Sequence, residues 1–244
     1  MELIKEAGFD AVSLWWEDEE EGDKYYILDS ARKMKLEVEN IHLPIEGCDD
    51  FWHKDSAKRV AAVSKYLAWI HDCKMHNIPI MVMHVSNNNT SLEPCIEGIN
   101  ALSVLAEEAE KCGVMLAVEN TQGQERFIPY VFSQIKSPNL GFCYDSSHDW
   151  LLSTQKTKLL NRFGNRLTVL HISDNDGKED RHWLPWEGII DWNLVASNIP
   201  ACFNWYLTLE VFPKLKEEPF AFLVAANERA AKLRNLIDIQ GTSI

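Results

Sequence analysis

The sequence has no surplus of positive charge. Its 24 lysine and arginine residues are outnumbered by 37 aspartate and glutamate residues, which gives the 244-residue chain a formal net charge of -13. Proteins that bind a nucleic-acid backbone usually present a basic surface to it. The composition therefore argues against a nucleic-acid partner.

Signals of disulfides, membrane insertion and secretion are also absent. No Cys-x-x-Cys pair occurs, so the scattered cysteines are typical of buried, reduced thiols. They are Cys48, Cys73, Cys95, Cys112, Cys143 and Cys202. No apolar run approaches the length that spans a bilayer, and no basic-then-apolar leader follows Met1. We therefore expect a cytoplasmic protein without a membrane partner.

What the sequence does contain is a regular alternation of apolar runs and amphipathic stretches. The runs are nearly continuous rather than alternating, as in parallel strands that helices cover on both faces. We expect strands over residues 9–16, 36–43, 79–85, 114–119, 140–145, 167–172 and 205–211. No low-complexity linker interrupts the alternation. The sequence therefore predicts one α/β domain over residues 1–244.

The stretches between these runs have helical periodicity. We expect helices over residues 1–7, 25–34, 50–77, 127–135, 149–163, 191–199 and 219–237. The segment Thr90-Ser-Leu-Glu93 matches a capping box and predicts a helix that begins there and ends at Gly113. The segment 173–188 has little periodicity, and we expect it to be a long loop.

Acidic or imidazole side chains stand at the ends of six apolar runs. The six residues are His42, His84, Glu119, Asp145, His171 and Glu210. Aspartate, glutamate and histidine fill 37 plus 8, or 45, of 244 positions, so this agreement is not plausibly accidental. Such residues are common ligands of divalent metals. His148 follows Asp145 by three residues and adds another imidazole to the set.

Two architectures place functional residues at the carboxyl ends of parallel strands. A doubly wound sheet typically carries a glycine-rich phosphate loop, which this sequence lacks. A closed ring of strands converges the ends of many strands on one point. We therefore predict a TIM-type (β/α) barrel. Only seven strands are recognisable, so the barrel is predicted to be short at its N-terminus and to lack its first strand.

The order of these residues resembles that of the xylose-isomerase-like superfamily of barrels. Its members include ketose 3-epimerases, hydroxypyruvate isomerases, inosose dehydratases, dehydroshikimate dehydratases and endonuclease IV. The segments that carry the resemblance are Ile41-His42-Leu-Pro, Met83-His84-Val, Ala117-Val-Glu119-Asn120, Tyr144-Asp145-Ser-Ser-His148, Leu170-His171-Ile-Ser-Asp174, Asp180-Arg-His182, Glu187-Gly188-Ile-Ile-Asp191-Trp192 and Leu209-Glu210.

The resemblance implies a sugar isomerase or epimerase, or one acting on a related polyol or keto acid. Its single divalent metal ion, manganese, zinc, cobalt or magnesium, would bind to Glu119, Asp145, His171 and Glu210. Mixed carboxylate and imidazole ligands suit such an ion. Glu119 and Glu210 would act as the acid/base pair, moving a proton next to a carbonyl through an enediolate.

Further residues are expected to contact a sugar or sugar-like substrate. The resemblance gives this role to His148, while His42 and His84 would line the pocket. Trp15 ends the first predicted strand and would either stack on the substrate or pack in the core. Many epimerases carry an arginine shortly after the position of His171, and Lys178 or Arg181 would take its place here. Asp145 would either bind the metal or simply cap the following helix.

Three other interpretations stay open. Endonuclease IV, a three-metal enzyme that cleaves DNA at abasic sites, has nine ligand positions with counterparts here. They are His42, His84, Glu119, Asp145, His148, His171, Asp180, His182 and Glu210. A dehydratase of the inosose or dehydroshikimate type would use the same pocket. A degenerate barrel with only a binding role is the third, and the complete set of ligand-type residues argues against it.

A barrel without its first strand would leave two strand edges unpaired, those of residues 9–16 and 205–211. Each buried backbone group without a partner costs roughly 1–3 kcal/mol. We therefore expect a second copy of the chain to cover the gap and form a homodimer. Sedimentation at micromolar concentration should show a dimer. A clean monomer whose two edge strands are both protected from hydrogen exchange would contradict this expectation.

Overall fold

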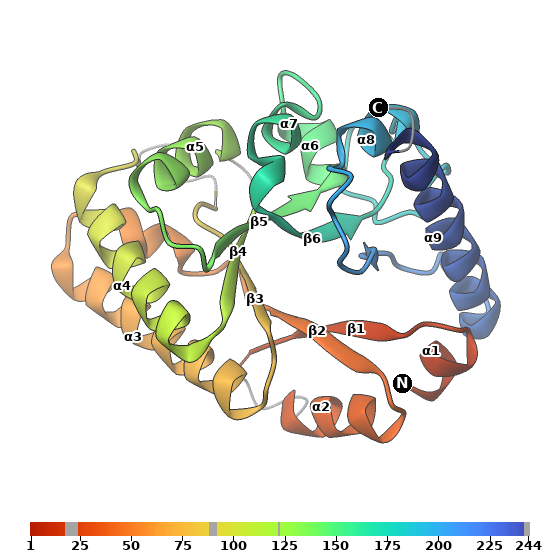
Figure 1. Cartoon of the computed structure of the whole chain (residues 1–244), viewed down its shortest axis with the longest axis horizontal. Coiled ribbons are helices and arrows are strands. Elements are labelled where there is room, and N and C mark those ends of the chain that lie inside the picture. Colours follow the sequence, from red (N-terminus) through yellow and green to blue (C-terminus); the bar gives the residue numbers. More distant parts are fainter. Residues whose placement is uncertain (18–23, 88–91, 122, 242–244) are drawn as a thin grey trace. The chain divides into compact units, whose positions relative to one another are not determined.

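The protein is described by a computed structural model that covers residues 1–17, 24–87, 92–121 and 123–241. Helices and strands alternate along this chain (Figure 1). In order they are α1 (Glu2–Glu6), β1 (Ala11–Trp15), α2 (Lys24–Lys33), β2 (Glu37–His42), η1 (Cys48–Trp52), α3 (Ser56–Met75), β3 (Ile80–Met83), α4 (Ile96–Cys112), β4 (Met115–Glu119), α5 (Gln124–Gln134), β5 (Leu140–Asp145), α6 (Ser146–Leu152), α7 (Lys158–Phe163), η2 (Gly164–Arg166), β6 (Leu167–Ile172), α8 (Trp192–Asn198), β7 (Thr208–Leu209) and α9 (Pro219–Gly241).

The seven strands belong to one sheet whose strand order follows the sequence, β1 to β7. β2 pairs with β3, β3 with β4, and β6 with β7, each in parallel. Every residue of β3, β5 and β6 is buried, as expected for strands with a helix layer over them. The predicted strand count and the near-continuous apolar pattern are therefore confirmed.

The chain forms two compact units. One consists of Met1–Val12, Tyr25–Val38 and Cys143–Ile244. In this unit α1 contacts α9, and Phe9 and Leu209 pack against a buried cluster of Leu184, Phe222 and Ala226. We call it the terminal unit, because it contains both ends of the chain.

The other unit, which we call the central unit, consists of Ser13–Lys24 and Glu39–Phe142. It contains β3 and β4 side by side, and α3 packs against α4 (Figure 1). Two tryptophans, Trp16 and Trp69, lie fully buried in this unit. Among the described helices of both units, none combines the length and hydropathy that crossing a membrane requires.

The helix predicted over residues 149–163 is instead two helices, α6 and α7. Asp149 is buried and accepts hydrogen bonds from the Tyr144 hydroxyl at 3.0 Å, the Ser153 hydroxyl at 2.5 Å and the Thr157 backbone N–H at 2.6 Å. The chain turns at Thr157, whose φ is 59°. The Lys156 ammonium donates to three carbonyl groups at the end of α6. These contacts end the first helix where periodicity alone would continue it.

Two other predicted helix starts are wrong. Thr90 and Ser91 of the predicted capping box lie outside the described residues, but residues 92–95 are not helical and α4 begins at Ile96. Pro94 explains the delay, since a proline disfavours the helical conformation of the residue before it. The helix predicted over residues 50–77 is interrupted after η1, and α3 begins at Ser56 with Asp55 as its N-cap.

The last predicted strand, residues 205–211, is shorter than expected. Only Thr208 and Leu209 form ladder pairs, and both are half-buried. The preceding Tyr206 instead donates its hydroxyl to the Glu37 carboxylate at 2.8 Å. The apolar run is therefore real, but only its middle contributes to the sheet.

Replacing Asp149 with alanine should destabilise the protein strongly. The substitution leaves the buried Tyr144 hydroxyl and Thr157 N–H without their acceptor, and each such group costs roughly 1–3 kcal/mol. We expect the free energy of unfolding, measured by urea denaturation, to fall by about 3 kcal/mol. The matched control is Asp29→Ala, at an exposed position of α2, which should change it by less than about 0.5 kcal/mol. Equal effects of the two substitutions would contradict the assigned role.

Candidate active site

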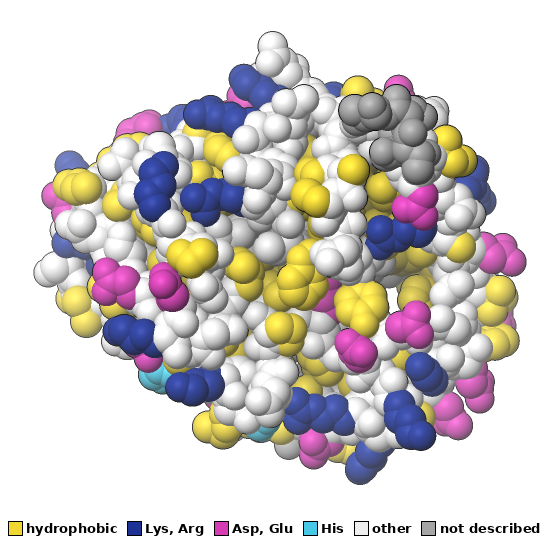
Figure 2. All heavy atoms as spheres, viewed as in Figure 1, with side chains coloured by type: hydrophobic (Ala, Val, Ile, Leu, Met, Phe, Trp, Pro, Cys, Tyr) yellow, Lys and Arg dark blue, Asp and Glu magenta, His cyan; other side chains and the backbone are white. Residues whose placement is uncertain are grey.

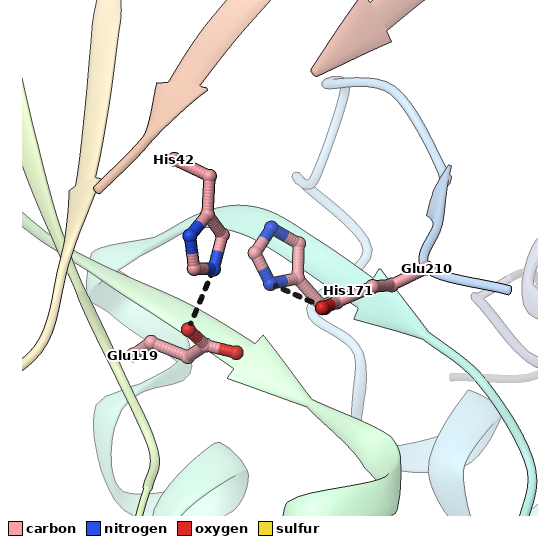
Figure 3. Close-up of side chains that lie close together, drawn as sticks. All are labelled: His42, Glu119, His171 and Glu210. Carbon is pink, nitrogen blue, oxygen red and sulfur yellow. Dashed lines mark hydrogen bonds and ion pairs between the residues drawn. The ribbon is translucent and has the colours of Figure 1, made fainter. Parts of the chain in front are cut away.

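In the central unit, three side chains meet beyond the ends of neighbouring strands. His42 ends β2, His84 follows β3, and Glu119 ends β4. One carboxylate oxygen of Glu119, Oε2, lies 3.1 Å from His42 Nε2 (Figure 3) and 2.7 Å from His84 Nε2. Glu119 and His84 are only 1% and 4% exposed. The parallel register of β2, β3 and β4 brings these three residues together.

The group combines two imidazole rings with one buried carboxylate. His42 Nδ1 lies 3.1 Å from the carbonyl oxygen of Leu43, which can only accept, so Nδ1 carries a proton. In a neutral ring, His42 Nε2 would then present a lone pair to the Glu119 carboxylate. A cation between the two groups makes that pairing favourable. The donor set therefore fits a divalent cation.

Trp15 extends this group toward the solvent. It ends β1, is 53% exposed, and stacks on the His42 ring with centroids 5.3 Å apart and an interplanar angle of 18°. Its indole N–H donates to Glu17 at 2.9 Å. Its neighbour Trp16 is the core residue of the pair and is fully buried. Trp15 is thus an exposed aromatic ring beside the strand-end group.

In the terminal unit, His171 and Glu210 form a second strand-end pair. His171 lies in β6 and Glu210 follows β7 directly, with its N–H bonded to the Ile172 carbonyl at 3.1 Å. His171 Nδ1 lies 3.1 Å from Glu210 Oε2 (Figure 3). The histidine side chain is 2% exposed and that of the glutamate 31%. A carboxylate that solvent still reaches is suited to exchange protons with a bound molecule.

Asp145 does cap the helix that follows it. Its Oδ1 accepts the His148 N–H at 2.6 Å and so satisfies the first turn of α6. The residue is fully buried at the end of β5. A metal ligand at this position would use the other oxygen, Oδ2. The two roles predicted for Asp145 are therefore compatible with each other.

A third carboxylate joins the His148 ring to the long loop. Asp180 Oδ2 lies 3.2 Å from both His148 Nε2 and His182 Nε2, and its Oδ1 accepts from the Ser147 hydroxyl at 2.5 Å. Burial opposes the charge of Asp180, but hydrogen bonds from His148 and His182 outweigh it and hold its pKa well below the ordinary value. Burial disfavours the charged form of His182 and so lowers its pKa. Asp180 and the nearby Glu210 act in the opposite direction and raise this pKa to about 9.

The loop that carries Asp180 is organised by Asp174, a residue to which the sequence assigned no role. The Asp174 carboxylate accepts from three backbone N–H groups and from the Trp192 indole, at distances of 2.9–3.1 Å. Gly188 passes so close that an added Cβ would lie 2.3 Å from Asp174 Oδ1. His182 and Trp186 have positive φ values of 49° and 69°. The loop is therefore held in a strained, specific conformation.

The two basic residues expected to bind substrate lie on the exposed side of this loop. Arg181 pairs with Asp176 at 2.9 Å and with Glu179 at 2.7 Å. Lys178 is exposed, and its backbone N–H donates to Asp176 at 2.9 Å. Their role toward a substrate stays a prediction.

Comparison with known proteins identifies the class. The model of the family described as xylose isomerase-like TIM barrel matches residues 1–232, so the chain belongs to this family. Its fold is an α/β TIM barrel, as the sequence predicted, with seven strands in the part of the chain that the structure describes.

The chain also matches individual proteins over about half of its length. The chain is 34% identical over 122 residues to the uncharacterized protein y4fM of Sinorhizobium fredii, a match that covers 48% of this chain and 38% of that protein. It is 27% identical over 136 residues to the fructoselysine 3-epimerase of Escherichia coli O157:H7, covering 52% of this chain and 50% of the epimerase. The matched segments thus span half or less of these relatives.

Solved structures resemble the whole chain. A D-tagatose 3-epimerase-like protein superposes with a TM-score of 0.76 at 18% identity, covering 98% of this chain and 94% of that one. An L-ribulose 3-epimerase gives the same TM-score at 16% identity, covering 98% and 88%. At these identities the likeness establishes the fold.

Proposed function

We propose that the protein is a divalent-metal-dependent sugar isomerase or epimerase. One observation carries the proposal. In each unit a strand-end glutamate lies within hydrogen-bonding distance of a strand-end imidazole, Glu119 with His42 and His84, and Glu210 with His171. Membership of the xylose isomerase-like family and relatives named as sugar 3-epimerases support the same chemistry.

We assign the ion, manganese, zinc, cobalt or magnesium, to Glu119, Asp145, His171 and Glu210. When bound, it would polarise the carbonyl of a sugar substrate. The chain's own part is proton transfer: one glutamate removes the proton beside the carbonyl, and the other returns a proton to a carbon of the substrate. The imidazoles that contact these carboxylates fix their orientation and compensate their charge.

Substrate recognition would come from the surrounding polar and aromatic groups. Trp15 offers an exposed indole face on which the apolar face of a sugar ring can stack. His42, His84 and His148 can donate to or accept from sugar hydroxyl groups. Lys178 and Arg181 are the basic residues closest in sequence to the position where many epimerases carry an arginine.

A second candidate is a three-metal phosphodiesterase that acts on DNA. The observation that favours it is the bridging of His148 and His182 by Asp180, which places three more ligand-type groups together. Against it stands the net charge of -13. On the face shown in Figure 2, basic side chains are interspersed with acidic ones rather than gathered in a stripe. A dehydratase would share the first proton transfer and differ only in losing a hydroxyl group.

Glu210→Gln should abolish most proton transfer, because the amide cannot act as a base. In deuterated solvent, exchange of the proton next to the carbonyl of a ketose substrate should fall by at least about 10²-fold. Nuclear magnetic resonance of the sugar measures the exchange. The control is Glu187→Gln, a loop carboxylate that pairs with Lys214 at 2.7 Å, and it should keep the wild-type rate.

Two results would reject this function. One is a Glu210→Gln rate within about threefold of the wild type. The other is cleavage of abasic-site DNA by the wild-type protein above the level of contaminants, together with no exchange on any ketose. That second pattern would support the three-metal phosphodiesterase.

Trp15→Ala should weaken substrate binding more than it slows the chemistry. Losing one aromatic contact of about 1.4 kcal/mol corresponds to an increase of about tenfold in KM, with kcat changed by less than about threefold. The control is Trp205→Ala, because Trp205 is also exposed, at 40%. An unchanged KM for Trp15→Ala, or an equal change for both variants, would remove Trp15 from the substrate site.

A further inference from the structure

A second group of metal-type ligands lies on the outer surface of the central unit, between α3 and α4. His71 comes from α3, and Glu108 and Cys112 come from α4. Glu108 and Cys112 are four residues apart and therefore face the same way on their helix. Because α3 packs against α4, the imidazole of His71 meets both of them. The proposed catalytic chemistry does not account for this group.

The two contacts of Glu108 lie within a few tenths of an ångström of the edges of a zinc coordination tetrahedron. His71 Nε2 lies 3.0 Å from Glu108 Oε1, and Cys112 Sγ lies 3.8 Å from the same oxygen. All three ligand atoms lie within 4.8 Å of one another. Zinc bonds of about 2.0 Å to nitrogen or oxygen and about 2.3 Å to sulfur give ligand–ligand separations of roughly 3.3–3.6 Å. Shifts of a few tenths of an ångström would therefore bring both contacts of Glu108 to these separations.

Charge and exposure also suit a cation. Hydrogen bonds from His71 and then from Lys111 lower the pKa of Glu108, so it is a carboxylate at neutral pH. Lys111 contacts the other oxygen, Oε2, at 3.3 Å, and its side chain is 69% exposed. It can therefore move away without opening the group. The His71 side chain is 54% exposed, so water can reach a fourth coordination position.

A nearby thiol is excluded as a ligand. Cys73 is fully buried, and burial together with the neighbouring Asp72 and Cys112 raises its pKa. Cys112 is partly exposed and is the sulfur ligand that solution can reach.

We propose that His71, Glu108 and Cys112 form a zinc site on the surface of the central unit, with water as the fourth ligand. The mixture of imidazole, carboxylate and thiolate selects zinc or cobalt over magnesium or manganese. The bound ion would link α3 to α4 on their outer side. This inference stands independently of the proposed catalytic function, because none of its ligands belongs to the strand-end groups.

Cobalt(II) titration tests the site, because a thiolate bound to cobalt gives an intense charge-transfer band in the near ultraviolet. The strand-end ligands contain no sulfur and are silent in this band. The wild-type protein should develop the band with the intensity of one thiolate-bound cobalt per chain, and zinc should bleach it. Cys112→Ser should lose the band, and His71→Ala should need at least about tenfold more cobalt. The control, Cys202→Ser, removes an exposed cysteine and should keep the wild-type band.

Alkylation provides a measurement on the unmodified protein. Zinc should slow the reaction of Cys112 with iodoacetamide, followed by mass spectrometry, and leave the reaction of Cys202 unchanged. The proposal is overturned if the wild type shows no charge-transfer band, if the band persists in Cys112→Ser, or if zinc protects neither cysteine or both equally. These results are separate from ketose exchange, so failure here would not count against the proposed catalytic function.

Discussion

The arrangement of side chains at the ends of β2, β3 and β4 depends on one constraint, the burial of the Glu119 carboxylate. A charged carboxylate that is 1% exposed is costly to bury unless nearby groups compensate its charge. His42 and His84 both direct Nε2 at one of its oxygens. Since His42 Nδ1 already donates to a carbonyl, a cation between the carboxylate and the imidazoles would suit the group. This need to compensate buried charge is the physical basis of the proposed divalent-ion site.

Much of this arrangement is predictable because it is local in sequence. Strands 140–145 and 167–172 have the predicted bounds, since long apolar runs between turn residues leave few alternatives. A residue that ends such a run lies at the carboxyl end of its strand, so the strand-end carboxylates and imidazoles can be read directly from the order of residues. Membership of the family is confirmed, because the family model matches residues 1–232.

What the sequence could not predict depends on contacts between distant residues. The break between α6 and α7 depends on the hydrogen bond from the Thr157 N–H to Asp149. The spacing of apolar residues does not reveal this bond. The Asp180–His148 contact and the loop around Asp174 join segments 16–32 positions apart. The group of His71, Glu108 and Cys112 likewise depends on how α3 packs against α4. One local feature of the sequence pointed to the unusual conformation of the Asp174 loop. It is the glycine at position 188, within a largely aperiodic stretch.

The central claim is that the strand-end carboxylates and imidazoles bind one divalent ion. Counting bound manganese after equilibrium dialysis tests it most directly, because manganese prefers oxygen and nitrogen ligands and avoids the thiolate of Cys112. The account predicts one manganese ion per wild-type chain and almost none in His171→Ala, with the fold of both confirmed by circular dichroism. Three ions per chain, none in the wild type, or an unchanged count in His171→Ala would contradict it.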